Sequence, residues 1–567
     1  MHGQLVARWQ TFAVIFCAAV LGSPLVCEAG GGPENVLLVV NANSEASKTV
    51  ANHYIDVRKI PSTNVLHLNF PVGKVTIPSN LFRKRILEPI FKEIESRNLA
   101  KQIDCVAYSC DFPWRVDFKK EYAAEQLGRP FTPMCSLTSA TYLYAFVLQQ
   151  RKEMFGLNAN FYCGPPNDLV VVSRAFRSGY RWSLGGRRAG QEGLPYMLSA
   201  MLGVNSVPGN TVDEIAWYLQ RAASADATAP KGTIYFAVNK TIRSKVRDSG
   251  FPAAVRLIQL AGVRAEIIQA FFPQGKQDVA GVTSGHSNVN PAGSGSRLLP
   301  GAFCDNLTSS GGQFLPDKGQ TCLSEFLRMG AAGANGTVVE PTAIPQKFPN
   351  STFHVHYVHG CSLAESFYQS VAGPFQQILV GDPLCQPWAK IPKVTVSGLP
   401  DSGFVKAQVE IVPSSKAPQG IASFQLFVDG VAQQQILPGE RFQLDTTKIA
   451  DGYHEVRVVA VDNTPMETQG RWIGSIVVKN GRDAIQLSVA AGTANSSLLN
   501  LNVAATKPSA TSILCQGVEV AKLPSGEGSV AVDKKKLGAG PVTLIAIAEG
   551  EPSLRSQPLR VVISSSP

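Results

Sequence analysis

A histidine and a cysteine each stand at the end of an apolar run that the sequence predicts as a strand. His286 follows "DVAGVTSG" (278–285), and Cys304 ends "RLLPGAFC" (297–304). A thiol becomes a nucleophile when a nearby imidazole accepts its proton, so this pair predicts a catalytic cysteine with its general base. A loop histidine beside a buried or disulfide-bonded cysteine is the alternative interpretation, and the sequence leaves both open.

Two carboxylates also stand at predicted strand ends, Glu340 in "VVEP" and Asp382 in "VGDP". Open α/β sheets keep their sites at the carboxyl ends of strands. We therefore expect one edge of a sheet to bring together four candidate catalytic residues, which are His286, Cys304, Glu340 and Asp382. A turn cap explains the aspartate equally well, and a structural role explains the glutamate equally well.

Further polar groups near the cysteine fit the same chemistry. Asp305 and Asn306 follow it directly and could orient the imidazole. The glycine-rich segment 308–313, "TSSGGQ", could supply backbone N–H groups to an oxyanion hole.

A second group of imidazoles lies in "FHVHYVHG", residues 353–360. As a strand, this segment places His354 and His356 on one face with His359 close by, and imidazoles spaced in this way can share a metal ion. No carboxylate or fixed fourth ligand accompanies them. We therefore predict a solvated polar strand face, with no metal and no cofactor.

Nucleotide binding and serine hydrolysis are disfavoured because the sequence contains no P-loop, no G-x-G-x-x-G fingerprint and no nucleophile elbow at a strand–helix junction.

Strands and helices alternate over residues 33–390. The apolar run 35–43 is typical of a strand buried on both faces, and residues 44–58 follow as a helix with Ser44 as its N-cap. The same alternation resumes after an irregular insert at about 111–230. This order predicts an α/β domain with a mostly parallel sheet and flanking helices.

The composition changes after this domain. Short runs that alternate polar and apolar residues, separated by turn signals, predict an Ig-like β-sandwich over 391–480. A second β-sandwich is predicted over 481–567.

Two stretches resemble an uncharacterised secreted bacterial family that occurs in genomes with exosortase-type sorting systems. They are "PENVLLVVNANSEASKTVANHYIDVRKIPSTNVLHL" and the blocks from "LPGAFCDN" to "GANGTVVEP" and "ILVGDPLCQPW". The resemblance covers roughly residues 35–388 and implies an exported envelope protein without an established activity.

The architecture is also similar to that of gingipain-like, caspase-fold cysteine peptidases, which carry an Ig-like domain after the catalytic domain. In those enzymes His-Gly follows one sheet strand and the nucleophilic cysteine follows the next. Here "SGHSN" and "GAFCDN" take these places, although Ser287 stands where glycine is expected. The resemblance implies a cysteine endopeptidase with a Cys304–His286 dyad as the alternative to a non-catalytic binding or processing component.

The first 29 residues have the pattern of a signal peptide, with Arg8 before an apolar stretch from Phe12 to Leu21 and small residues after it. That stretch is too short for a committed membrane span, so we expect a secreted, periplasmic or cell-surface protein with no transmembrane anchor after cleavage. An oxidising compartment favours disulfides among the nine cysteines that remain, and the odd number leaves at least one thiol unpaired.

The formal net charge is +10, and basic residues gather in 82–92, 173–188 and 239–247. A solvated basic face explains these clusters, and an anionic polysaccharide or an envelope protein is the partner that they would fit. No nucleic-acid-binding motif accompanies them.

Overall fold

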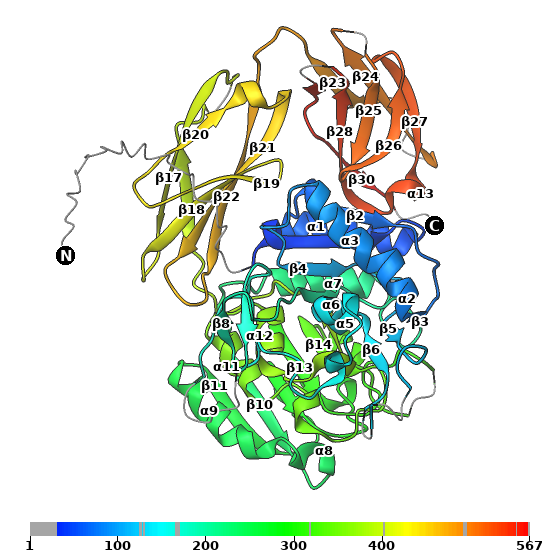
Figure 1. Ribbon diagram of the computed structural model, residues 1–567, viewed down its shortest axis with the longest axis vertical. Coiled ribbons are helices and arrows are strands. Elements are labelled where there is room, and N and C mark those ends of the chain that lie inside the picture. The colour runs from blue at the N-terminus through cyan, green and yellow to red at the C-terminus, as the bar shows by residue number, and fades with distance from the viewer. Residues whose placement is uncertain are drawn as a thin grey trace, which may run out of the picture.

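The computed structural model describes residues 31–123, 127–128, 131–164, 171–316, 319–400, 403–490, 496–507, 509–550 and 553–564. An α/β domain forms one end of the molecule, and two β-sandwiches lie side by side at the other (Figure 1). The predicted signal peptide, with Cys17 and Cys27, lies outside the described residues.

A ten-stranded sheet forms the centre of the α/β domain. Its strands, in spatial order, are β11 (Arg264–Gln269), β10 (Thr233–Val238), β12 (Val279–Ser284), β13 (Leu298–Asn306), β14 (Gly333–Thr337), β15 (Gln377–Gly381), β9 (Leu198–Met201), β4 (Cys105–Tyr108), β1 (Val36–Asn41) and β2 (Val65–Leu68). Every residue of β1, β4, β12 and β14 is buried, as expected for strands covered on both faces. The structure therefore confirms a mixed α/β domain with a mostly parallel sheet.

The strand direction changes once across this sheet. β15, β9, β4, β1 and β2 are parallel to one another and run opposite to β11, β10, β12, β13 and β14. β15 pairs with β14 in antiparallel fashion, with Gly333 opposite Gly381 and Thr337 opposite Gln377. The chain after β15 therefore returns to the amino-terminal end of β14. There the N–H of Asp382 donates to the carbonyl of Ala332 at 2.9 Å.

Helices cover the sheet, and local capping fixes where the main ones begin. Ser44 accepts a hydrogen bond from the N–H of Ser47 at 2.9 Å, and capping boxes begin α7 at Thr211 and α12 at Ser362. The helices are α1 (Glu45–Arg58), α2 (Ser79–Phe82), α3 (Glu88–Ser96), α5 (Leu137–Tyr142), α6 (Tyr144–Leu148), α7 (Val212–Ala223), α8 (Ile242–Lys245), α9 (Phe251–Leu260), α10 (Ser324–Arg328), α11 (Thr352–Val358), α12 (Leu363–Ser370) and, in the second sandwich, α13 (Lys534–Leu537).

The insert at about 111–230 contributes ordered elements to the domain. It contributes β9 to the main sheet and α7 to its cover. The insert also contributes to two small sheets. In one, β5 (Arg115–Asp117) and β6 (Met134–Ser136) join β3 (Thr76–Pro78), which precedes the insert, and the other consists of β7 (Arg181–Ser183) and β8 (Arg187–Ala189).

Two sequence-based assignments are corrected. Residues 353–360 were expected to form a polar strand, but they form helix α11, in which every residue from Phe353 to Val358 is buried. A helix that is buried on every side has no polar face, so its sequence does not show the helical repeat of apolar residues. The edge strand β11 was not predicted. Its residues, "RAEIIQ", do not alternate regularly between polar and apolar types, and most of them are exposed.

The two sandwiches have separate cores but share one sheet. The first contains β16 (Lys393–Ser397), β17 (Gln408–Lys416), β18 (Ile421–Val428), β19 (Val431–Ile436), β20 (Phe442–Asp445), β21 (Asp451–Asp462) and β22 (Gln469–Val478). The second contains β23 (Ile485–Val489), β24 (Leu498–Ala505), β25 (Thr511–Cys515), β26 (Val518–Leu523), β27 (Gly528–Asp533), β28 (Gly540–Ala548), β29 (Leu554–Arg555) and β30 (Leu559–Ile563). Parallel pairing of β21 with β29 joins them into a nine-stranded sheet.

All nine cysteines of the described residues are free thiols, so the expected disulfides do not form. Eight are buried, most of them in the apolar core that surrounds the main sheet. In the described part of the chain, none of the helices combines the length and apolarity needed to cross a membrane.

Candidate functional site

Cys304 lies inside strand β13 rather than at its end. It pairs with Val282 of β12, and the strand continues for two residues to Asn306. Its side chain is 1% exposed, and burial raises the pKa of the thiol well above its ordinary value. A buried thiol that resists deprotonation has the properties of a core residue.

His286 lies beyond the end of β12 and is half-buried. Its Nδ1 lies 2.7 Å from the carbonyl oxygen and 3.1 Å from the backbone nitrogen of Asn288, so the local loop occupies this ring nitrogen. The ring stacks on Phe271 with 3.9 Å between the centroids. Among the described residues, the imidazole makes no hydrogen bond to Cys304.

The residues expected to orient the imidazole have other partners. Asn306 holds the backbone of His286, accepting from its N–H at 3.1 Å and donating to its carbonyl at 3.0 Å. Asp305 forms a buried ion pair with Arg247. Neither side chain forms a hydrogen bond or ion pair with the imidazole.

The two candidate carboxylates lie at opposite ends of the strands of the main sheet. Glu340 is exposed beyond the carboxyl end of β14, where it accepts from the N–H of Thr342 at 2.9 Å. Asp382 is fully buried at the amino-terminal end of β14, because β15 runs antiparallel to β14. The expectation of one edge shared by all four candidates is therefore wrong for Asp382.

The contacts of Asp382 hold elements of the fold together. Its carboxylate accepts from the Tyr54 hydroxyl at 2.9 Å and from Nε of Arg58 at 2.7 Å. Arg58 also pairs with Asp226, so the guanidinium ties α1 to two loops at this edge.

The imidazoles of α11 do not converge on one point. His356 and His359 each place Nδ1 3.0 Å from the hydroxyl of Ser173, whereas the ring of His354 packs among Phe236, Phe303 and Phe353. Burial lowers the pKa of both His354 and His356 to about 3. Within the described ranges, no group of three His, Cys, Asp or Glu side chains is arranged to hold a metal ion.

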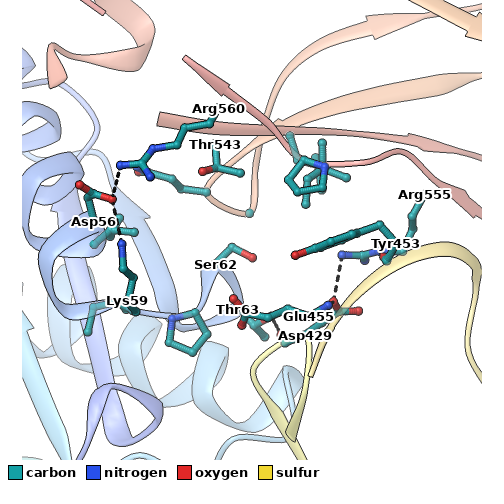
Figure 2. A pocket seen from close by; sticks show the side chains of 18 of the residues that line it. Asp56, Lys59, Ser62, Thr63, Asp429, Tyr453, Glu455, Thr543, Arg555 and Arg560 are labelled. Carbon is teal, nitrogen blue, oxygen red and sulfur yellow. Dashed lines mark hydrogen bonds and ion pairs between the residues drawn. The ribbon is translucent and has the colours of Figure 1, made fainter. Parts of the chain in front are cut away.

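A cavity of about 460 Å³ lies where the three domains meet (Figure 2). The α/β domain contributes the end of α1 and the loop that follows it, including Lys59, Ser62 and Thr63. The first sandwich contributes Tyr453 from β21, and the second contributes Thr543 from β28. This volume falls within the range of about 300–1,000 Å³ that is typical of small-molecule sites.

The cavity wall is polar with apolar patches. Figure 2 shows the hydroxyls of Ser62, Thr543 and Tyr453 around the open space. The apolar part of the lining comes from isoleucine, leucine and proline side chains, namely Ile55, Ile60, Pro61, Leu514, Pro541, Ile545, Ile547 and Pro558.

Ion pairs between domains close two sides of the cavity. Asp56 of α1 pairs with Lys59 at 3.1 Å and with Arg560 of the second sandwich at 2.7 Å, so two cations share one carboxylate. On the other side, Arg555 lies 3.4 Å from Asp429. The side of the cavity that holds Asp56, Lys59 and Arg560 therefore keeps an excess of positive charge.

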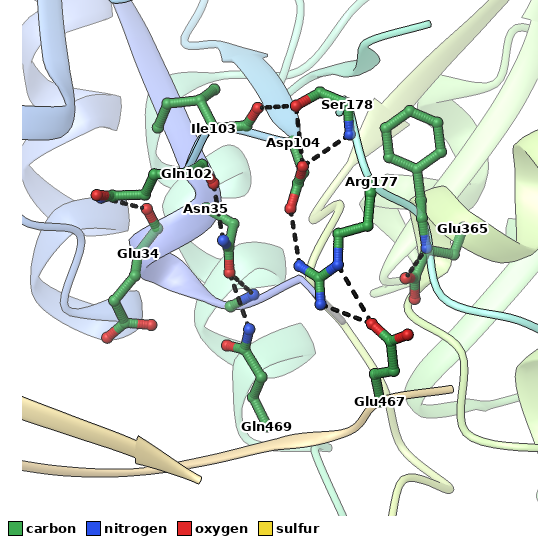
Figure 3. A network of polar contacts seen from close by, with 12 residues as sticks. Glu34, Asn35, Gln102, Ile103, Asp104, Arg177, Ser178, Glu365, Glu467 and Gln469 are labelled. Carbon is green, nitrogen blue, oxygen red and sulfur yellow. Dashed lines mark hydrogen bonds and ion pairs between the residues drawn. The ribbon is translucent and has the colours of Figure 1, made fainter. Parts of the chain in front are cut away.

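A buried polar network fixes the first sandwich to the α/β domain (Figure 3). Arg177 lies between Asp104, at 3.2 Å, and Glu467 of the sandwich, at 2.7 Å. Burial raises the pKa of Asp104 to about 6, against the effect of Arg177. Nearby, the amide of Gln469 donates to Asn35 at 3.0 Å.

Glu34 strengthens the same contact. It is fully buried and pairs with Arg457 at 2.9 Å and with Arg471 at 3.2 Å, both from the first sandwich. Two guanidinium groups hold the pKa of Glu34 below its usual value despite the opposing effect of burial. The wall that this sandwich gives to the cavity is thus held in place.

Sequence reasoning did not identify the junction cavity. Its lining comes from segments as far apart in the sequence as Asp56 and Arg560, which are separated by 504 residues, and none of them forms a recognisable motif. The only available signal was the prediction of three domains, because ligand sites often lie at domain interfaces.

No family model matches the chain, and no curated protein matches it in sequence. Among solved structures, the fibronectin(III)-like modules of Clostridium thermocellum CbhA share 16% identity over 30% of this chain and 92% of theirs, with a TM-score of 0.13. Dimeric latent PorU from Porphyromonas gingivalis shares 14% identity over 34% of this chain and 22% of its own, with a TM-score of 0.14. Bacteroides uniformis β-glucuronidase 3 shares 13% identity over 35% of this chain and 29% of its own, with a TM-score of 0.13.

The chain thus matches less than a third of the length of PorU and of the β-glucuronidase. At such low TM-scores these similarities are weak.

Proposed function

We propose that this chain is an exported, envelope-associated binding protein that holds an anionic saccharide at the junction of its three domains. The observation that carries the proposal is the cavity of about 460 Å³, which all three domains line. An envelope location is supported by the pattern of the first 29 residues and by the resemblance to a secreted family.

The lining suits a hydroxyl-rich ligand with a negative charge. Hydroxyls such as those of Ser62 and Thr543 both donate and accept hydrogen bonds, as sugar hydroxyls require. Lys59 and Arg560 share the single carboxylate of Asp56, which leaves positive charge for an acidic group of the ligand. Tyr453 adds an aromatic side chain with a polar tip.

We further propose that the α/β domain has a caspase-like origin. It is supported by the adjacent parallel strands β12 and β13, the first followed by His286 and the second carrying Cys304. A Cys304–His286 peptidase is the less favoured function, because the thiol is buried and the imidazole is bound to its own loop.

Isothermal titration of the full-length protein with an oligosaccharide of uronic acids tests the proposal, with a neutral oligosaccharide of equal length as the reference. We expect the acidic sugar to bind. Arg560→Ala and Thr543→Val should each weaken binding about tenfold, as expected for the loss of one charge-assisted or one neutral hydrogen bond. Arg441→Ala, which removes an exposed ion pair of the first sandwich, is the matched control. Equal affinity for both sugars, no binding, or no effect of the two cavity variants would contradict the proposal.

A further inference from the structure

A basic surface lies at the carboxyl edge of the main sheet, away from the junction cavity. It is formed by α8, which follows β10, and by the segments after β11 and β12, and its residues are Lys240, Ile242, Arg243, Lys245, Phe271 and His286. Figure 1 shows α8 at the end of the molecule remote from both sandwiches. We refer to these six residues as the edge surface.

Direct contacts hold the edge surface together. The side chains of Asn239 and Thr241 donate to the carbonyl of Gly285, at 3.1 Å and 3.0 Å, which places the start of α8 against the residue before His286. Phe271 reaches the same place from β11 and stacks on the imidazole. Three loops that follow neighbouring strands therefore form one continuous surface.

The cations of the edge surface lack acidic partners. Lys240 and Lys245 are exposed and Arg243 is half-buried, and in the described ranges none of them lies within ion-pair distance of a carboxylate. The guanidinium of Arg243 is 3.4 Å from the hydroxyl of Ser309, and this is its only side-chain hydrogen bond to a described residue. Arg247, the next cation along the chain, differs because Asp305 neutralises it.

Apolar side chains lie among these charges. Ile242 is 59% exposed and Phe271 is 50% exposed, although both belong to residue types that are usually buried. Exposed apolar side chains beside unpaired cations are complementary to a chain that alternates acidic and apolar residues. A polysaccharide would match the charges but would leave the aliphatic side chain of Ile242 without an apolar partner.

We infer that the edge surface binds an acidic segment of a partner polypeptide. Carboxylates of that segment pair with Lys240, Arg243 and Lys245, and its apolar side chains cover Ile242 and Phe271. This binding does not depend on the saccharide site, because the two surfaces share no residue.

Fluorescence anisotropy of a labelled synthetic peptide of alternating glutamate and leucine, titrated with the full-length protein, tests the inference. A peptide with glutamine in place of glutamate shows how much of the affinity depends on charge. We expect the acidic peptide to bind more tightly, and its affinity to fall steeply as salt is added. Arg243→Glu and Phe271→Ser should each weaken binding about tenfold or more, since one reverses a charge and the other removes an aromatic contact.

Lys416→Glu is the matched control, because it makes the same charge reversal at an exposed position of the first sandwich and should leave the affinity unchanged. Circular dichroism of each variant confirms that it is folded. Equal binding of the two peptides, or equal affinity of Arg243→Glu and wild type, overturns the inference. Displacement of the peptide by alginate, combined with no effect of Phe271→Ser, also overturns it and identifies the surface as a polysaccharide site.

Discussion

Arg58, the last residue of α1, donates two hydrogen bonds to the carboxylate of Asp382, which directly follows strand β15. Both side chains are almost fully excluded from solvent, and the Tyr54 hydroxyl donates to the same carboxylate. A residue that resembled a catalytic carboxylate in sequence is therefore an anchor between the first helix and the end of the sheet.

Replacing Asp382 by asparagine should lower the free energy of unfolding by about 3 kcal/mol, because it leaves the buried Arg58 guanidinium without one of its two carboxylates. Urea denaturation followed by circular dichroism measures this change. Glu340→Gln is the control, since Glu340 is exposed and should cost less than about 0.5 kcal/mol. Equal effects of the two substitutions would contradict the structural role of Asp382.

Cys304 should not react with iodoacetamide in the folded protein. Burial excludes the reagent and raises the pKa of the thiol, so little thiolate forms. Cys322 is partly exposed and should be labelled first. Mass spectrometry of peptides labelled before and after denaturation provides the measurement, and rapid labelling of native Cys304 would restore the peptidase interpretation.

The protein should lose stability as the pH falls below about 6.5, in part because of His354. Burial lowers the pKa of this imidazole from 6.5 to about 3. The unfolded chain therefore takes up a proton in a range where the folded chain does not, which favours unfolding at acid pH. Between about pH 7.5 and about pH 5 this one group should remove about 2 kcal/mol of stability.

His354→Leu tests this assignment, because leucine fits the surrounding cluster of phenylalanine rings and does not titrate. Urea midpoints at the two pH values should differ less for this variant than for the wild type. Parallel pH dependences for the two proteins would show that His354 does not contribute.

Replacing Glu34 by glutamine should loosen the first sandwich from the α/β domain. The substitution leaves Arg457, which is 2% exposed, with Glu455 as its remaining carboxylate partner, and it removes the ion pair of Arg471. Loss of one member of a buried ion pair costs about 3–5 kcal/mol. Differential scanning calorimetry should then resolve two unfolding transitions where the wild type gives one, whereas an unchanged single transition would mean that other contacts are sufficient.

The sequence predicted the sheet better than it predicted the sites. Runs such as 36–41 are continuous and apolar because both faces of the strand are covered, and Ser44 marks the start of α1 with a capping hydrogen bond. Local signals of this kind determine single elements. The direction of β15 depends instead on long-range pairing, so "VGDP" gave no indication that Asp382 lies at the opposite edge from Glu340.

The same limit applies to the candidate sites. Cys304 and His286 follow apolar runs as predicted. Strand β13, however, continues for two residues beyond Cys304, so the cysteine lies inside the strand and is buried. Strand boundaries are difficult to predict to that accuracy. The junction cavity depends on how three domains pack, which local patterns do not encode. The basic segment 239–247 was visible in the sequence, and the structure adds that Asp305 neutralises Arg247 whereas Arg243 has no acidic partner among the described residues.

The antiparallel pairing of β15 with β14 determines where the chain leaves the α/β domain. With β15 in the same direction as β14, residues 382–390 would leave the sheet at the end where α8 lies. Because it runs the other way, the linker departs at the far edge, and a partner much larger than a peptide can approach α8 without steric conflict with either sandwich.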